Sequence, residues 1–173
     1  MTRLISDRRG AVYVEFLISI VPFFLFVLCV LQGALLQLGH LVTERAADAA
    51  ARSAVVVLDD DPARYGGVAR NSATGARMDT IKRAADNVLA ALPGTSAADR
   101  GAALTVEIPG GTVGTEAPVN VRVQYRFRCS VPLARLVICS GANSGGTPGT
   151  FVIETQATLP NQGARYAYTG GGQ

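Results

Sequence analysis

The chain has 173 residues, a formal net charge of +3 and a hydrophobic fraction of 49%. Only 17% of the residues are charged, and the arginines are scattered, whereas a nucleic-acid-binding surface needs a concentrated basic stripe. Once a membrane span is set aside, roughly 130 residues remain, enough for one compact domain. The composition therefore predicts a small anchored domain with no nucleic acid among its partners.

The N-terminus is short and basic, and a long apolar run follows it. Arg3, Arg8 and Arg9 outweigh the single acidic residue of this segment, and no Asp, Glu, Lys or Arg occurs from Phe16 to Val42. About 20 helical residues cross roughly 30 Å of hydrocarbon, so the run is long enough to span a membrane. Because basic residues stay on the cytoplasmic side, we expect the C-terminal portion on the other side.

A cleaved secretory signal peptide is one alternative for this region. Its apolar core should be about 7–15 residues long and end at a small-x-small cleavage site. The run here is longer and offers only Gly33-Ala34 as a weak site. We therefore expect a retained helix, and a secreted binding domain is the third-ranked alternative.

One carboxylate, that of Glu15, lies at the head of the apolar run, five residues past Gly10. An unpaired carboxylate facing lipid costs several kcal/mol, so ionisable groups within membranes usually mark a functional site with a partner. In the alternative of a plain single-pass anchor, Glu15 lies at the interface and is solvated there. Gly10 also has an alternative explanation: it is a simple helix-entry glycine, whose backbone angles are permissive.

The plain anchor leaves the combination of residues around Gly10 unexplained. Arg8-Arg9-Gly10 followed by Ala11-Val12-Tyr13-Val14-Glu15-Phe16 resembles the processing site of type IV prepilins, where a membrane aspartic peptidase cuts after the glycine. With Pro22 inside the span and an alanine-rich helix after it, the chain resembles the TadE-like pseudopilins of tight-adherence (Flp-type) pilus systems. The match covers roughly the first third of the chain well and the remainder only by architecture.

This resemblance implies a minor pilin or pseudopilin that takes part in assembly of a tight-adherence pilus or a related secretion system. A prepilin peptidase would cleave between Gly10 and Ala11, and Glu15 with Phe16 would serve assembly. The implied partners are that peptidase, other pilin or pseudopilin subunits, the inner-membrane pilus assembly platform and membrane lipid. The implied location is the bacterial inner membrane, with the C-terminal domain periplasmic, or an extracellular filament. An uncleaved single-pass periplasmic interaction protein is the alternative function.

The spacing of Gly10 and Glu15 also has a chemical reason of its own. Cleavage after Gly10 creates an α-amino group on Ala11, at a helix N-terminus that already carries partial positive charge. Glu15 lies four residues further on and so faces the same side of the helix as Ala11. Its carboxylate can neutralise this ammonium, or that of a neighbouring subunit, in a packed bundle of low dielectric.

Beyond the span, the helix is expected to continue to about Val57. Its alanines, at positions 46, 47, 49, 50, 51 and 54, are strong helix formers with little bulk. They suit close packing of neighbouring helices in a filament core and docking on the protein's own domain equally well. Asp59-Asp60-Asp61-Pro62 then ends the helix. Three adjacent aspartates invite a calcium site, but the spaced ligands of an EF-hand are missing, which favours a solvated turn.

The rest of the chain predicts an α+β domain on this helix. Apolar residues at helical spacing from Met78 to Leu92 indicate an amphipathic helix that Pro93-Gly94 ends. Alternation with a period of 2 indicates strands at Leu104–Ile108, Val119–Arg128 and Phe151–Ala157. We expect a three- to four-stranded antiparallel meander with the amphipathic helix packed on one face. The other face, with arginines 122, 126 and 128, should meet water.

The cysteines fit an oxidising compartment. Cys129 and Cys139 lie about ten residues apart, and a disulfide between them would stabilise the fold by about 2–4 kcal/mol. Cys29 is expected as a small buried residue within the span. Metal binding competes with the disulfide, but two thiols and the distant His40 fall short of the four ligands of a structural zinc site.

No catalytic motif is present in the sequence, so we expect no enzyme, no cofactor and no metal. The lone histidine, His40, lies at the expected membrane edge and fits an interfacial residue better than a base. The predicted organisation is a basic leader in residues 1–10, a transmembrane and extended helix in 11–58 and a connector in 59–75. An extracytoplasmic α+β domain follows in 76–162, and a flexible tail in 163–173.

Overall fold

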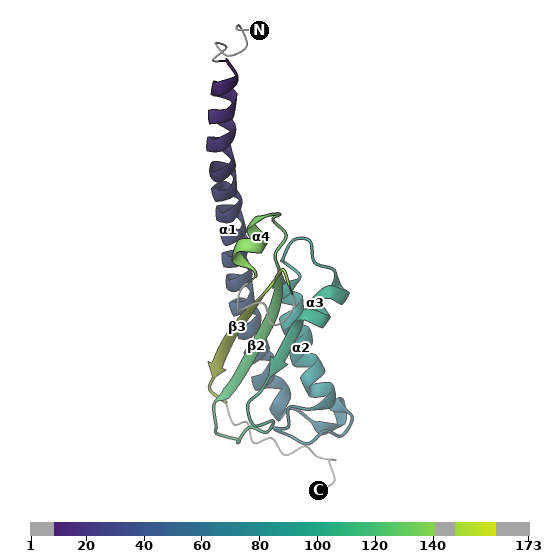
Figure 1. Ribbon diagram of the computed structural model, residues 1–173. Helices are drawn as coiled ribbons and strands as arrows, with labels where there is room; N and C mark the ends of the chain where they lie inside the picture. The colour runs from purple at the N-terminus through teal and green to yellow at the C-terminus, as the bar shows by residue number, and fades with distance from the viewer. Residues whose placement is uncertain (1–8, 141–147, 162–173) are drawn as a thin grey trace, which may run out of the picture. The chain divides into compact units, whose positions relative to one another are not determined.

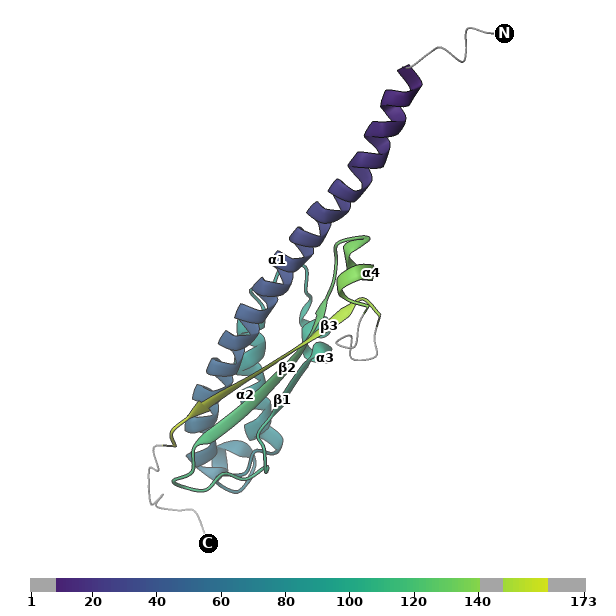
Figure 2. The same ribbon diagram turned by 60° about the vertical axis from the view of Figure 1, so that its left-hand side comes forward.

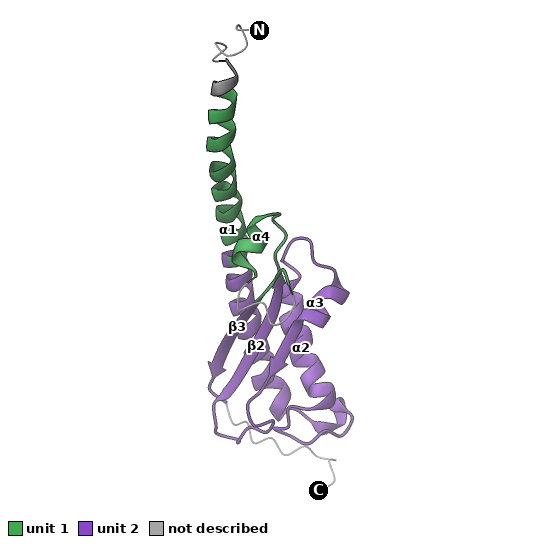
Figure 3. Ribbon diagram, in the orientation of Figure 1, with its two compact units in different colours: residues 1–36, 128–151 green, residues 37–127, 152–173 purple. Residues whose placement is uncertain are grey.

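The computed structural model describes residues 9–140 and 148–161. Its elements in chain order are α1 (Arg9–Asp59), the 3-10 helix η1 (Pro62–Tyr65), α2 (Gly75–Leu89), α3 (Ala97–Ala103), β1 (Leu104–Glu107), β2 (Val119–Arg128), α4 (Ala134–Ile138) and β3 (Thr150–Leu159) (Figure 1). The chain divides into two compact units (Figure 3). Unit 1 comprises residues 1–36 and 128–151, and unit 2 comprises residues 37–127 and 152–173.

Helix α1 confirms the long N-terminal helix that the sequence predicts. It has 51 residues, ends at Asp59 and continues through Pro22. Among the residues described, it is the only helix long and apolar enough to cross a membrane. The predicted anchor segment therefore exists as a single uninterrupted helix.

The core of unit 2 lies between α1, α2 and one face of the sheet (Figure 2). Its fully buried side chains include Ala46, Ala50 and Ala54 from α1, Ile81, Ala85 and Leu89 from α2, and Val119, Val121 and Val123 from β2. Alanines let helix and sheet backbones approach closely, and interiors must be close-packed. The alanine-rich part of α1 therefore docks on its own domain, one of the two alternatives that its composition left open.

The sheet is three-stranded and antiparallel in the order β1-β2-β3, as predicted for a meander. Leu104 lies opposite Tyr125, and Glu107 lies opposite Arg122. Along β2 the inward residues are buried, whereas the arginines at 122, 126 and 128 are exposed. The α+β fold class is confirmed, with three strands in the described ranges where three or four were expected.

The structure adds short elements that periodicity did not predict. Helix α3 begins at Ser96, whose Oγ accepts a hydrogen bond from the Asp99 N–H at 3.2 Å, a regular N-cap. Helix α2 begins at Gly75, three residues before Met78, and ends at Leu89. After it the chain tightens into turns, in which the Leu92 N–H donates to the Leu89 carbonyl at 3.0 Å. The predicted flexible tail in 163–173 lies outside the described residues.

Candidate functional site on the apolar helix

The predicted processing and assembly residues all lie in the first turns of α1. The helix begins at Arg9, so Gly10 and Ala11 have helical backbone and are followed one turn later by Glu15 and Phe16. Because α1 is continuous here, Ala11 and Glu15 fall on the same face, as the spacing of four predicts. The carboxylate of Glu15 is exposed, and it has no partner in the part of the chain that the structure describes.

The segment of α1 from Val12 to Leu31 presents apolar side chains on every side. Its exposed large residues are Val12, Tyr13, Val14, Phe16, Leu17, Ile18, Ile20, Val21, Phe23, Phe24, Leu25, Phe26, Val30 and Leu31. A continuous apolar surface of this size marks a membrane or protein contact, since water-soluble monomers rarely leave one uncovered. At 1.5 Å per residue the segment is about 30 Å long, which equals the hydrocarbon thickness of a bilayer.

The first polar side chain buried along α1 is that of Gln32, which is 0% exposed. Its Oε1 accepts a hydrogen bond from the Val131 N–H at 3.0 Å. Both residues belong to unit 1, so the loop between β2 and β3 lies against α1 at this point. The Gln32 Oε1 thus has a donor, whereas its Nε2 is buried and has no hydrogen-bond partner among the described residues.

The predicted disulfide is present: Cys129 and Cys139 are bonded and close a loop that contains α4. The Cys129 N–H donates to the Gly149 carbonyl at 2.9 Å, which joins the two ends of the segment between β2 and β3. Cys29 is free and partly exposed on α1, although the sequence predicted a buried residue. The difference arises because the protein itself leaves this part of the helix uncovered.

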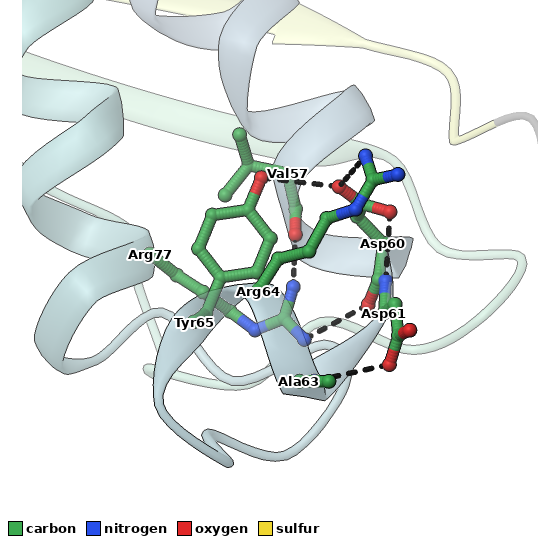
Figure 4. A network of polar contacts seen from close by, with 7 residues as sticks. All are labelled: Val57, Asp60, Asp61, Ala63, Arg64, Tyr65 and Arg77. Atoms are coloured by element: carbon green, nitrogen blue, oxygen red, sulfur yellow. Dashed lines mark hydrogen bonds and ion pairs between the residues drawn. The ribbon is translucent and has the colours of Figure 1, made fainter. Parts of the chain in front are cut away.

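A second polar cluster, centred on Arg77, lies at the C-terminal end of α1 (Figure 4). The Arg77 side chain is 0% exposed. Its Nη1 donates to the Val57 carbonyl, and its Nη2 donates to the carbonyls of Asp60 at 2.9 Å and Val68 at 3.1 Å. The last carbonyls of a helix have no intrahelical donor and form the negative end of its dipole. Arg77 therefore caps α1 from a different helix.

The aspartates after α1 belong to this cap. Asp60 Oδ1 accepts from the Asp61 N–H at 2.8 Å, and Asp60 Oδ2 accepts from the Tyr65 hydroxyl at 3.2 Å. The Asp61 hydrogen bond is the main reason why the pKa of Asp60 lies below its ordinary value. Burial raises the pKa of Tyr65, whose ring lies 4.5 Å from the Arg77 guanidinium carbon. The turn is hydrogen-bonded, and its aspartates are partly exposed to solvent.

Within residues 9–140 and 148–161, no three His, Cys, Asp or Glu side chains are grouped so that they could hold a metal ion. His40 Nδ1 lies 3.2 Å from a carboxylate oxygen of Glu44, one turn further along α1, and both side chains are about half exposed. This is an ordinary surface pair on a helix.

Sequence reasoning missed Arg77, although a signal for it exists. Arg77, Ile81 and Ala85 are spaced by four, which places the arginine on the buried face of α2. A charged residue at an apolar position of an amphipathic helix indicates a partner elsewhere in the fold. That partner is a set of backbone carbonyls, which no residue pattern displays.

The fold and this site define an α+β domain carried on a long, exposed apolar helix. No family model matches the chain, and neither a curated protein nor a solved structure is detectably similar to it. The resemblance to TadE-like pseudopilins therefore depends on the motif around Gly10 and Glu15 and on the architecture.

Proposed function

We propose that this protein is a minor pilin or pseudopilin of a tight-adherence (Flp-type) pilus or a related secretion system. In this proposal α1 holds the protein in the bacterial inner membrane, and a prepilin peptidase cleaves between Gly10 and Ala11. The observation that carries it is the placement of Gly10 and Glu15 at the head of one helix whose next turns are exposed and apolar.

Cleavage would change the charge balance of the helix end. It removes the arginine leader and leaves an ammonium on Ala11, with the Glu15 carboxylate one turn away on the same face. Opposite charges at that distance attract each other most strongly where water is excluded. A processed helix is thus nearly neutral overall and can leave the bilayer for a packed filament at a lower desolvation cost than an unprocessed one.

The exposure of α1 supports one segment of this helix as the contact for other subunits. The alanines from Ala46 to Ala54 are largely buried in the protein's own domain and are not available for contacts between subunits. The bulky residues from Val12 to Leu31 are exposed. Helix packing with other pilin or pseudopilin subunits would therefore use this N-terminal segment, after the peptidase and the inner-membrane assembly platform have acted on it.

Mass spectrometry of the protein isolated from its native cell envelope tests the processing step. We expect an N-terminus at Ala11, and we expect Gly10→Phe to leave a full-length chain because the peptidase no longer accepts the site. An N-terminus at Met1 or Thr2 would show an uncleaved anchor, and one beyond Leu31 would show a secreted domain.

The assembly step is tested by Glu15→Ala. This variant should insert and be cleaved normally but should enter filaments at least about tenfold less, equivalent to a loss of about 1.4 kcal/mol or more in pairing energy. Glu44→Ala is the matched control, since it removes an exposed carboxylate from the domain part of the same helix. Equal incorporation of the Glu15 and Glu44 variants would exclude the assembly role of Glu15.

The uncleaved single-pass periplasmic interaction protein is the second candidate. It is favoured by the exposure of Glu15 near the end of the apolar segment, where water can solvate its charge without any partner. In that case Gly10 serves only as a helix-entry glycine. The Gly10→Phe variant should then keep the location of the unsubstituted protein and differ from it in mass only by the substitution.

A further inference from the structure

The loop closed by the disulfide leaves three apolar side chains uncovered. Leu133 is 55% exposed, and Leu136 and Val137 are each 63% exposed. The residues that anchor the loop, Ala134 and the two bonded cysteines, are buried. The loop therefore has a packed inner side and an apolar outer side, and we refer to Leu133, Leu136 and Val137 as the apolar foot.

The backbone holds Leu133 in an uncommon conformation. Its φ is +63° and its ψ is −52°, while the Ala134 N–H donates to the Pro132 carbonyl at 2.7 Å across a three-residue turn. A branched side chain at positive φ is strained, and such strain persists only where the surrounding structure enforces it. The turn thus presents a leucine outward at a conformational cost.

The foot lies on α1 where the exposed apolar segment ends. Within unit 1, the Val131 N–H bonds to Gln32, and the residue before it, Leu31, is still 52% exposed. The twenty residues from Val12 to Leu31 measure about 30 Å along a helix, the thickness of the hydrocarbon core. If this segment spans the bilayer, as the proposed function requires, Gln32 and the loop bound to it lie at the membrane surface.

The charges near the foot are those that suit an anionic lipid surface. Arg128 and Arg135 are exposed, and no acidic residue occurs between Arg128 and Ser140. Apolar side chains flanked by arginines are typical of segments that lie in the membrane interface, with the cations at the headgroups. Lipid that surrounds the turns of α1 before Gln32 would also reach the apolar foot, because the foot lies next to the end of that segment.

We propose that the loop from Cys129 to Cys139 is a membrane-contacting foot. Leu133, Leu136 and Val137 enter the boundary between headgroups and acyl chains, and Arg128 and Arg135 contact anionic headgroups. The disulfide holds the short helix α4 in place, and the hydrogen bond to Gln32 sets the depth of the foot relative to α1. This inference rests on the membrane insertion in the proposed function but not on cleavage or filament assembly.

The chain contains no tryptophan, so a single introduced tryptophan reports its own surroundings. The experiment places the full-length Leu136→Trp protein in phosphatidylethanolamine and phosphatidylglycerol vesicles, with and without bromine on the acyl chains. We expect blue-shifted emission that is about twofold or more weaker with brominated lipid, since interfacial side chains reach about 5–10 Å into the acyl boundary. Leu17→Trp reports the span, and Val56→Trp, at an equally exposed position of unit 2, should stay unquenched.

The controls separate failure of the foot from failure of the anchor. If Leu17→Trp is quenched and Leu136→Trp is not, the foot is wrong and the anchor stands. If Leu17→Trp is itself unquenched, the anchor fails, and the foot and the proposed function fall together. Blue-shifted emission of Leu136→Trp that bromine does not quench and that dilution with lipid abolishes would show a second copy on the foot, which also overturns the proposal.

Discussion

The two ends of α1 share one secondary structure but differ in residue size and exposure. From Val12 to Leu31 the helix carries bulky side chains that are exposed on all sides. From Thr43 to Leu58 the buried face of the helix consists mostly of small residues, with Ala46, Ala50 and Ala54 at 0% exposure. We refer to these as the apolar half and the domain half.

The difference indicates what surroundings each half is suited to. Close packing against a sheet and a second helix needs small side chains, because backbones must approach and volumes must fit. A half that meets lipid needs apolar area but no such fit. The domain half also has an outer stripe of charged residues, Glu44, Arg45, Asp48 and Arg52, which are all exposed and face water. The apolar half has no such stripe.

The largest expected effect concerns the end of the domain half. Arg77→Met keeps the apolar stem but removes the donors to the carbonyls of Val57, Asp60 and Val68. A buried acceptor left unpaired costs roughly 1–3 kcal/mol, so we expect the free energy of unfolding to fall by about 4 kcal/mol. Urea titration of the full-length protein in detergent, followed by near-UV circular dichroism of the buried Tyr125, measures this loss.

The matched control is Arg83→Met on the same helix. The hydrogen bonds of Arg83, to Asp79 and Thr80, are exposed, so the change should stay within about 0.5 kcal/mol. Equal losses for the two variants would mean that Arg77 does not cap α1.

The second prediction compares the two halves directly at equal exposure. Phe26 is 67% exposed and Val56 is 68% exposed in the isolated chain. In a Cys29→Ser background, Phe26→Cys and Val56→Cys each provide one free thiol, since the other two cysteines are bonded. Only the thiolate reacts, and it does not form in hydrocarbon. We expect a water-soluble maleimide to label Val56→Cys at least about 100-fold faster in opened membrane vesicles.

Unfolding in dodecyl sulfate should make the two rates similar, which excludes intrinsic differences between the thiols. Comparable rates in the intact membrane would show that water, rather than lipid, covers the apolar half.

Much of this fold follows from periodicity. Helix α2 and all three strands were predicted because a repeat near 3.6 or 2 identifies elements with one buried face, and α1 was predicted from the length of its apolar run. Helix α3 has seven residues, none of them buried, so no apolar stripe marks it. Its Ser96 cap was the available signal.

The candidate site also contains residues that the sequence predicts and residues that it does not. The spacing of Gly10 and Glu15 is local, so the sequence alone placed both residues on the first turns of one helix. The partners of Arg77 and Gln32 are backbone groups far along the chain, at Val57 and Val131, and depend on tertiary packing. The foot also escaped prediction, because the five-residue helix α4 is too short for any periodicity to show and lies inside a loop that the disulfide closes.

The smallest expected effect lies at Gly39, one turn before the domain half. A Cβ at this position would lie 2.8 Å from Phe127 Cδ2 and 3.2 Å from Ile153 Cδ1, so the Phe127 ring must move if one is added. Overpacking of this kind costs about 1–3 kcal/mol, while alanine gains about 0.5–1 kcal/mol over glycine within a helix. We expect Gly39→Ala to destabilise unit 2 by about 1 kcal/mol in the same urea titration. Gly33→Ala is the control, because a Cβ there meets nothing within 4 Å. If Gly39→Ala stabilised the protein as much as Gly33→Ala, α1 would not approach the sheet as closely as the alanines of its domain half imply.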